Sequence, residues 1–114
     1  MKCTREGIIG GHTSSGYVID TIVPYVALPS VLALHRFVKI TNPLMALSTY
    51  AICLDVGPWN THDDDYVLRG ARPQAESGKD LFGRVTNGSG IDLGEAVWHR
   101  LAMAGNTTVE WEFI

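Results

Sequence analysis

The sequence has no long hydrophobic run and no cluster of basic residues. Its longest apolar stretch, residues 23–34, is interrupted by two prolines and a serine, and it falls short of the roughly 20 residues that a membrane-spanning helix needs. Nine Lys and Arg residues are scattered along a chain of 114 residues with a net charge of −3, so no basic stripe is present to neutralise nucleic-acid phosphates. We therefore expect neither a membrane span nor a nucleic-acid partner.

Cysteine is scarce, and the usual markers of secretion, nucleotide binding and zinc binding are absent. Cys3 and Cys53 allow at most one intramolecular disulfide, which excludes a disulfide-stabilised scaffold and leaves their pairing open. The residues after Met1 contain no apolar signal-peptide core, so we expect no signal peptide in this chain. Residues 7–11 lack the spacing of a dinucleotide-binding loop, and the histidines lack zinc-type spacing. We expect no metal and no cofactor.

Length and composition indicate one globular domain over residues 1–114. Hydrophobic residues make up 46% of the chain and charged residues 18%, which is typical of a folded domain with a single core. Twelve glycines and five prolines indicate many turns. Short extended segments between turns favour a mainly β fold.

Local patterns predict short strands, with one helical turn, in the first two thirds of the chain. Residues 1–16 are interpreted as a loop, and residues 17–28 as one or two strands. Ser30 is placed to cap a helical turn that runs to residue 34. Residues 36–41 alternate and, with residues 49–54, predict a hairpin. Residues 60–90 are interpreted as an irregular excursion, in which residues 62–65 form a solvated acidic loop rather than a cation site.

The C-terminal part of the chain predicts a helix followed by a strand. Apolar residues recur at helical spacing over residues 93–103. Asp92 precedes this segment and Glu95 follows three positions later, which is a capping-box arrangement, and Gly105 with Asn106 ends the helix. Residues 107–114 then alternate, with the apolar side chains expected to face inward.

Two aspartates are candidates for acid–base chemistry. Asp55 follows an apolar strand and begins a Gly-Pro turn, where lost hydration would raise the pKa of its carboxyl, as a general acid requires. The alternative is that Asp55 accepts hydrogen bonds from its own turn amides. Asp92, as a helix N-cap, would have a lowered pKa, which suits a base, a charge stabiliser or a purely structural cap.

Two further residues suit sugar binding. Trp59 stands in the loop after Asp55, where an indole is suited to stack on the apolar face of a sugar and equally suited to cover the end of the core as a lid. His12 lies in a loop rich in Gly, Ser and Thr, which is compatible with a catalytic or sugar-binding role.

Four segments of the chain, taken in order, resemble motifs of the rare lipoprotein A–like domains. They are residues 12–16, beside the family's Thr-Ala-Ser-Gly; residues 26–30 with 37–42, beside its A-x-x-x-L-P…V-x-V-T-N run; residues 54–58, beside N-D-R-G-P; and residues 90–96, beside I-I-D-L-S-x-A-A. Order and spacing agree over roughly residues 12 to 114.

The resemblance implies a six-stranded double-psi β-barrel, a fold that the family shares with expansins, barwin and family-45 endoglucanases. We accordingly expect a mainly β barrel with one or two short helices, in which a C-terminal helix is followed by a final strand. The resemblance also implies a polysaccharide partner, peptidoglycan or a related glycan, and a location in the cell envelope or outside the cell. We expect the protein to be a monomer.

The resemblance also assigns roles to individual positions. Asp55 matches the aspartate of the Gly-Pro turn and is expected to be the general acid, with Asp92 as its helper. Thr13, Ser15 and His62 fall on or near motif positions and, with His12 and Trp59, are expected to bind substrate. The implied activity is cleavage of peptidoglycan strands, as in a lytic transglycosylase or a glycoside hydrolase. The alternatives are a non-catalytic, expansin-like module that binds or loosens wall polysaccharide, or a structural barrel in a larger assembly.

Overall fold

Short strands of mixed direction make up most of the regular structure. The computed structural model describes residues 1–6, 9–80, 82–104 and 108–114. In chain order, its elements are β1 (Cys3–Arg5), β2 (Tyr25–Leu28), the 3-10 helix η1 (Val31–Ala33), β3 (Phe37–Asn42), β4 (Leu47–Val56), α1 (Asp64–Arg69), the 3-10 helix η2 (Gln74–Ser77), β5 (Ile91–Leu93), α2 (Glu95–Arg100) and β6 (Glu110–Phe113). No helix among these residues is both long and apolar enough to cross a membrane.

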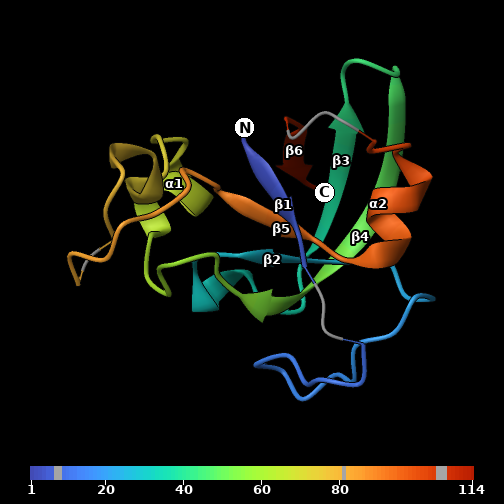
Figure 1. The fold of residues 1–114 in the computed structure, drawn as a ribbon, viewed down its shortest axis with the longest axis horizontal. Helices are drawn as coiled ribbons and strands as arrows, with labels where there is room; N and C mark the ends of the chain where they lie inside the picture. The colour runs from blue at the N-terminus through green and yellow to red at the C-terminus, as the bar shows by residue number, and fades with distance from the viewer. Residues whose placement is uncertain (7–8, 81, 105–107) are drawn as a thin grey trace.

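The strands of the described residues form one curled sheet, which resembles half of a barrel (Figure 1). Its strand order is β1-β5-β2-β4-β3-β6. β1 and β5 are parallel, as are β2 and β4, and the other neighbours are antiparallel. Lys2 and Thr108 form an isolated bridge, and Val109 N donates a hydrogen bond of 2.8 Å to Met1 O. These contacts join the residues just before β1 to the residues just before β6, the two edge strands of the sheet. The mainly β prediction is confirmed.

One face of the sheet carries the apolar core. Strand alternation explains which residues enter it, because successive side chains point to opposite faces. In β3, Val38 and Ile40 are buried while Phe37 is exposed, which agrees with the alternation predicted for residues 36–41. Near the C-terminus, Val109 is buried, Trp111 and Phe113 pack against the core, and the intervening glutamates are exposed, which confirms the expected facing of this strand.

The predicted hairpin and helical turn are both confirmed. β3 and β4 pair in antiparallel fashion. β4 extends beyond the predicted residues 49–54 because its second half continues as a parallel partner of β2. Ser30 caps η1, since its Oγ accepts a hydrogen bond of 3.2 Å from Leu32 N.

The N-terminal predictions are partly wrong. Residues 1–16 were expected to form a loop, yet Cys3–Arg5 forms β1, because β5 supplies a parallel partner for so short a segment. Within residues 17–28 only Tyr25–Leu28 is a strand. Residues 7 and 8 of the glycine-rich segment lie outside the described residues.

Residues 60–90 are more ordered than predicted, since they contain α1 and η2. The acidic run is not a solvated loop. Asp63 is buried, and its Oδ2 accepts a hydrogen bond of 2.8 Å from Gln74 N. Asp64 accepts one from Ser30 Oγ. Asp64 and Asp65 lie in the first turn of α1, where their negative charge complements the helix dipole.

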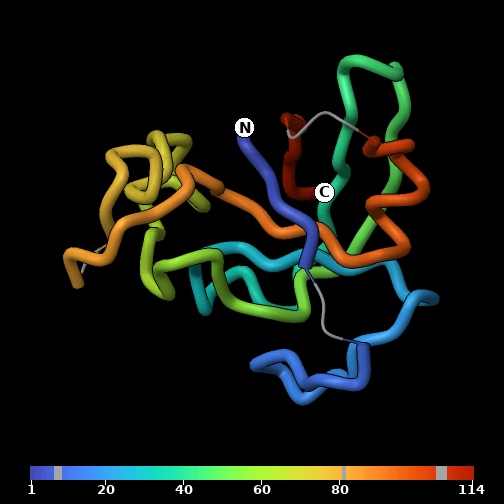
Figure 2. Tube along the Cα trace, viewed as in Figure 1, coloured from blue at the N-terminus to red at the C-terminus, as the bar shows by residue number. Residues whose placement is uncertain are grey.

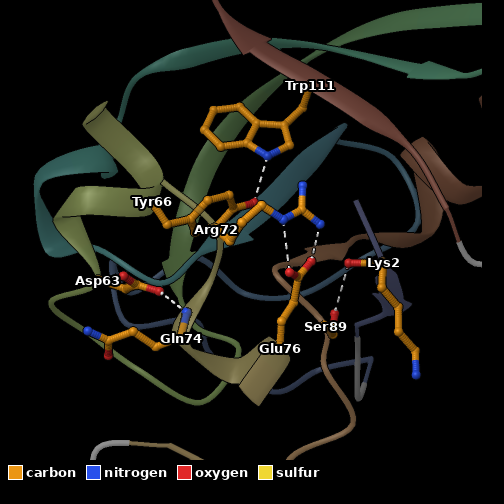
Figure 3. Close-up of polar contacts among 8 residues, drawn as sticks. All are labelled: Lys2, Asp63, Tyr66, Arg72, Gln74, Glu76, Ser89 and Trp111. Atoms are coloured by element: carbon orange, nitrogen blue, oxygen red, sulfur yellow. Dashed lines mark hydrogen bonds and ion pairs between the residues drawn. The ribbon is translucent and has the colours of Figure 1, made fainter. Parts of the chain in front are cut away.

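Tyr66 and Ser89 dock this segment on the rest of the molecule (Figure 3). Trp111 Nε1 donates a hydrogen bond of 2.7 Å to Tyr66 Oη, and the two rings meet edge to face. Ser89 Oγ lies 3.5 Å from Lys2 O, to which it donates. The excursion therefore packs on both edge regions of the sheet.

The C-terminal helix begins later than predicted. Residues 91–93 pair with β1 and β2 as a strand, so α2 spans Glu95–Arg100 rather than residues 93–103. Gly94 stands at the N-cap position and makes no side-chain bond, so the capping box with Asp92 is wrong. The predicted stop at residues 105–106, and residue 107 of the predicted final strand, lie outside the described residues.

Candidate functional site

A row of four residues crosses β1, β5, β2 and β4 on the face of the sheet opposite the core. Thr4 pairs with Asp92, Asp92 pairs with Ala27, and Ala27 pairs with Asp55. Their chain neighbours belong to the core instead: Cys3, Ile91 and Val26. The row therefore points Asp55 and Asp92 to the same side, with only the small side chain of Ala27 between them.

A β-bulge in β4 turns Asp55 to this face. Val26 and Ala27 are consecutive, but they pair with Cys53 and Asp55, so Leu54 is an extra residue in β4. Regular alternation would place Asp55 on the side of Cys53, whose side chain lies in the core. The bulge thus moves a carboxyl from the side of Cys53 to the opposite side of the sheet, a common use of bulges next to active sites.

The loop of residues 12–16 lies against the end of β4. The chain from residue 9 to residue 23 runs outside the strands (Figure 2). Ser15 Oγ donates a hydrogen bond of 2.6 Å to Leu54 O, which ties the loop to the bulge. Ser14 N then donates one of 2.9 Å to Asp55 Oδ1. The structure therefore brings the loop and Asp55 together through Ser15 and through a backbone amide that the sequence did not single out.

Asp55 is held as an anion. Burial by itself would raise the pKa of its carboxyl, but hydrogen bonds from the Glu6 carboxyl and from the Ser14 and Val56 amides outweigh burial and lower that pKa below its ordinary value. Val56 N donates to Oδ1 at 2.9 Å. The raised pKa predicted for Asp55 is wrong, because the loop and the bulge supply donors. The alternative, a bond from its own turn, is confirmed by the Val56 amide.

The pKa of Asp92 shifts in the opposite direction, upward. Burial raises its pKa to about 6, the negative charge of Asp55 adds to the rise, and the hydrogen bond from Thr4 Oγ1 opposes it. The lowered pKa predicted for an N-cap is wrong, because Asp92 lies within β5 and meets no helix amides. Of the two aspartates, Asp92 is the one whose carboxyl keeps its proton to the higher pH.

Glu6 is a third carboxyl of the site, and sequence reasoning missed it. It follows β1, and its backbone N donates a hydrogen bond of 2.8 Å to Leu93 O. Burial, a hydrogen bond with Asp55 and the charges of Asp55 and Asp92 raise the pKa of Glu6 to about 9. The signal of Glu6 in the sequence is that it lies two positions after Thr4, so that an extended chain turns both side chains to the same side. The strand is too short to be recognised from the sequence.

Tyr25 lies beside this cluster and is fully buried. Its ring packs so closely on Gly94 that a Cβ there would lie 2.5 Å from the ring, and Tyr17 meets it edge to face. Burial and the nearby Glu6 and Asp55 raise the pKa of the Tyr25 hydroxyl. Within the described residues, Tyr25 Oη and Glu6 Oε2 are buried without a hydrogen-bond partner of ordinary geometry.

Thr13 and His12 have different surroundings from each other. Thr13 is buried, and its Oγ1 accepts a hydrogen bond of 3.2 Å from Tyr17 N and lies 3.0 Å from Ser15 Oγ. Thr13 therefore maintains the loop. His12 is exposed and forms an isolated bridge with Val18.

Trp59 and His62 make their contacts with residues outside the row. Trp59 Nε1 donates a hydrogen bond of 3.0 Å to Asn87 Oδ1, and its carbonyl accepts one of 3.2 Å from Arg84. His62 is exposed and bridges to Ser30. In the part of the chain that the structure describes, neither residue is hydrogen-bonded to Asp55 or Asp92.

Cys3 and Cys53 are free, buried thiols, and burial raises the pKa of each to about 11. A thiol with so high a pKa is a poor nucleophile at neutral pH. Among the described residues, no group of three or more His, Cys, Asp or Glu side chains is arranged to hold a metal ion.

Residues 1–112 match a family model whose description is "Domain of unknown function (DUF8814)". The matched span contains all three carboxyl residues of the site, Glu6, Asp55 and Asp92. No curated protein matches the chain.

Proposed function

This chain belongs to the family described as "Domain of unknown function (DUF8814)", and we propose that it acts on cell-wall glycan and cleaves peptidoglycan strands by acid–base catalysis. The observation that carries the proposal is the row in which Asp92 and Asp55 face the same side across Ala27. The resemblance of residues 12–114 to the rare lipoprotein A–like domains supports the substrate class.

The spacing of the row suits a reaction that takes place between the two carboxyls. Neighbouring strands lie about 4.8 Å apart, so the Cα atoms of Asp92 and Asp55 are roughly 10 Å apart. Carboxyls about 6.5–9.5 Å apart accommodate a water molecule in inverting glycosidases, whereas retaining enzymes need about 5 Å. The Cα separation is compatible with either arrangement of the two carboxyls, and the end group of the product distinguishes the two reactions.

The pKa directions assign the roles. Asp92, with a pKa of about 6, donates its proton to the glycosidic oxygen as the bond from the anomeric carbon to that oxygen breaks. Asp55, whose pKa is lowered, accepts a proton from the attacking oxygen. If water attacks, the product has a reducing end. If a hydroxyl of the same sugar attacks, the product has an anhydro end.

The double-psi topology, the envelope location and the monomeric state are parts of the same proposal. Support for a closed barrel comes from the six strands and from the Lys2–Thr108 bridge, which joins the chain beside the edge strands. Location and glycan partner are supported by the motif resemblance.

Mass spectrometry of purified peptidoglycan after incubation with the protein tests the proposal. We expect shortened strands with anhydro or reducing ends. Asp92→Asn and Asp55→Asn each remove one proton-transfer group, and we expect about 10²–10⁴-fold slower cleavage in each. Asp65→Asn is the matched control, because Asp65 lies on α1 and pairs with Arg69 at 2.5 Å; it is expected to cleave at the parent rate.

Full cleavage by both Asn variants would contradict the assigned roles. If the parent leaves every strand intact but is retained by insoluble peptidoglycan in a pull-down, the protein is the non-catalytic, expansin-like module instead. If it neither cuts nor binds peptidoglycan or a β-1,4-glucan, the proposal of a glycan substrate fails.

A further inference from the structure

We propose that a pocket beside strands β3 and β4 binds a small carboxylic acid with an aromatic or branched apolar body. The pocket has a volume of about 360 Å³. The described residues that line it all lie outside the row of Thr4, Asp92, Ala27 and Asp55. The inference is therefore independent of the proposed function.

The two strands supply the aromatic part of the pocket. Phe37 pairs with Ile52, and Tyr50 lies two positions before Ile52, so these three side chains share the face of the sheet away from the core. Phe37 is 59% exposed and Tyr50 is 61% exposed. Diagonal neighbours across an antiparallel pair are close enough for aromatic side chains to act together. Both rings are therefore within reach of one ligand.

The remaining lining adds apolar surface and one positive charge. Val23 and Pro24 precede β2, and Arg100 is the last residue of α2, which packs beside β4 (Figure 1). Among the described residues that line the pocket, none is acidic. The pocket therefore combines an apolar surface with a single cation.

Arg100 differs from the other arginines of the described residues, because its guanidinium has no partner among them. Arg5, Arg69, Arg72 and Arg84 each pair with a carboxylate, and Arg36 Cζ lies 3.7 Å from the centroid of the Phe113 ring. The last turn of a helix favours a cation, but this position gives the five N–H donors of Arg100 no protein acceptor within the described part of the chain. Such a guanidinium binds a carboxylate through two parallel hydrogen bonds.

Size and charge select the class of ligand. Pockets for drug-sized ligands have volumes of about 300–1,000 Å³, so a pocket of about 360 Å³ suits a molecule with one ring or a short branched chain. One guanidinium balances one negative charge, whereas a phosphate monoester carries about −1.5 to −2 at pH 7. The aromatic rings offer apolar contact to the body of the ligand. A monocarboxylic acid with an apolar body therefore fits better than a phosphate or a sugar.

Titration with 3-phenylpropionate, followed by the amide NMR spectrum of the protein, tests the inference. We expect saturable shifts of the amide signals of Phe37, Tyr50, Ile52 and Arg100. Two further probes separate the parts of the ligand: 3-phenylpropionamide has the same body without the charge, and acetate has the charge without the body. We expect each of them to bind at least about tenfold more weakly than 3-phenylpropionate.

Three variants assign the contacts. Arg100→Gln removes the charge and should weaken the binding of 3-phenylpropionate about tenfold, with little change for the amide probe. Tyr50→Ala removes a ring and should weaken the binding of both probes. Arg69→Gln is the matched control, because Arg69 lies on α1 and pairs with Asp65; it should bind like the parent. The amide spectrum of each variant checks its folding.

The absence of saturable shifts at these residues in the parent would overturn the inference. Equal binding of the acid and the amide, or parent-like binding by Arg100→Gln, would overturn it as well, since the charge would then not be recognised. If Arg100→Gln does not fold, the comparison of the acid with the amide and Tyr50→Ala still decide the question.

A second copy of the chain is the competing occupant of the pocket. Shifts of the same amide signals with protein concentration, in the absence of any probe, would show that a second copy fills it, and the inference would fail. A protein that binds 3-phenylpropionate as expected but cuts no glycan loses the proposed function only.

Discussion

Asp55 and Asp92 each carry a carboxyl group and lie two strands apart in the sheet, yet their surroundings shift the two pKa values in opposite directions. Asp55 accepts bonds from two backbone amides and from Glu6, and these outweigh burial. Asp92 has the Thr4 hydroxyl as its donor, so burial prevails and the pKa rises to about 6. At this scale, the number of donors decides which carboxyl is ionised.

Asp92→Asn is expected to stabilise the protein at high pH. The pKa of Asp92 is about 6 in the folded protein, above its ordinary value of 3.8, so the folded state binds more protons between these values. Stability contributed by Asp92 therefore falls as pH rises from about 4 to about 6. An Asn cannot ionise and still accepts a bond from Thr4. Urea unfolding should show a gain for Asp92→Asn at pH 8 that vanishes toward pH 4.

The exposed Asp65→Asn, measured alongside, should change stability little at either pH, since surface ion pairs contribute about 0–1 kcal/mol. An Asp92→Asn protein that is less stable than the parent at pH 8 would show that the ionised carboxylate has a stabilising partner.

At the scale of elements, the site is made by the fit of a loop on a strand. The bulge at Leu54 turns the Asp55 side chain away from the core. The Leu54 carbonyl accepts the hydrogen bond from Ser15 that holds residues 12–16 in place. The Ser14 amide reaches Asp55 only while this loop is docked. The loop and the bulged strand therefore act as one unit.

Ser15→Ala is expected to release this loop. The change removes the bond of 2.6 Å to Leu54 O and should lower the free energy of unfolding by about 0.5–1.5 kcal/mol. Hydrogen exchange should be faster at the Ser14 amide, with little change in the strands. Ser48→Ala, which removes a hydroxyl bonded to Thr41 on the exposed hairpin, is the control and should leave Ser14 protected. Equal protection of Ser14 in both variants would contradict the anchoring role.

At the scale of the whole molecule, one apolar core joins strands from the start and from the middle of the chain. Cys3 on β1 and Cys53 on β4 both lie in this core and are fully buried. Neither thiol can meet a reagent in water unless the sheet opens.

Both thiols are therefore expected to resist alkylation by iodoacetamide in native buffer at pH 8. Burial limits access, and a pKa of about 11 keeps each thiol protonated. Mass spectrometry across a urea series should show both sites labelled together at the unfolding midpoint measured by Trp fluorescence. Fast labelling of one cysteine in native buffer would indicate local opening of its strand, and a non-labelled, oxidised pair would show that a disulfide forms.

The sequence by itself determined the elements whose signals are local. The alternation of residues 36–41, the Ser30 cap and the alternating C-terminal strand depend on nearest neighbours along the chain, and all three are present, the first as Phe37–Asn42. The sequence also identified Asp55 and Asp92 as carboxyls of interest and residues 12–16 as a segment of the site. What it could not supply was the environment of each carboxyl, because that depends on pairing with distant strands.

Tertiary structure alone decided three features of the site. Cys3–Arg5 is a strand only because residue 91 and its neighbours pair with it, and this strand delivers Glu6. Asp92 is a strand residue rather than a helix cap because β1 and β2 flank it. Asp55 faces the site because β2 imposes a bulge on β4. Each outcome is a matter of register between segments far apart in the chain, and a one-residue change of register reverses which face a side chain occupies.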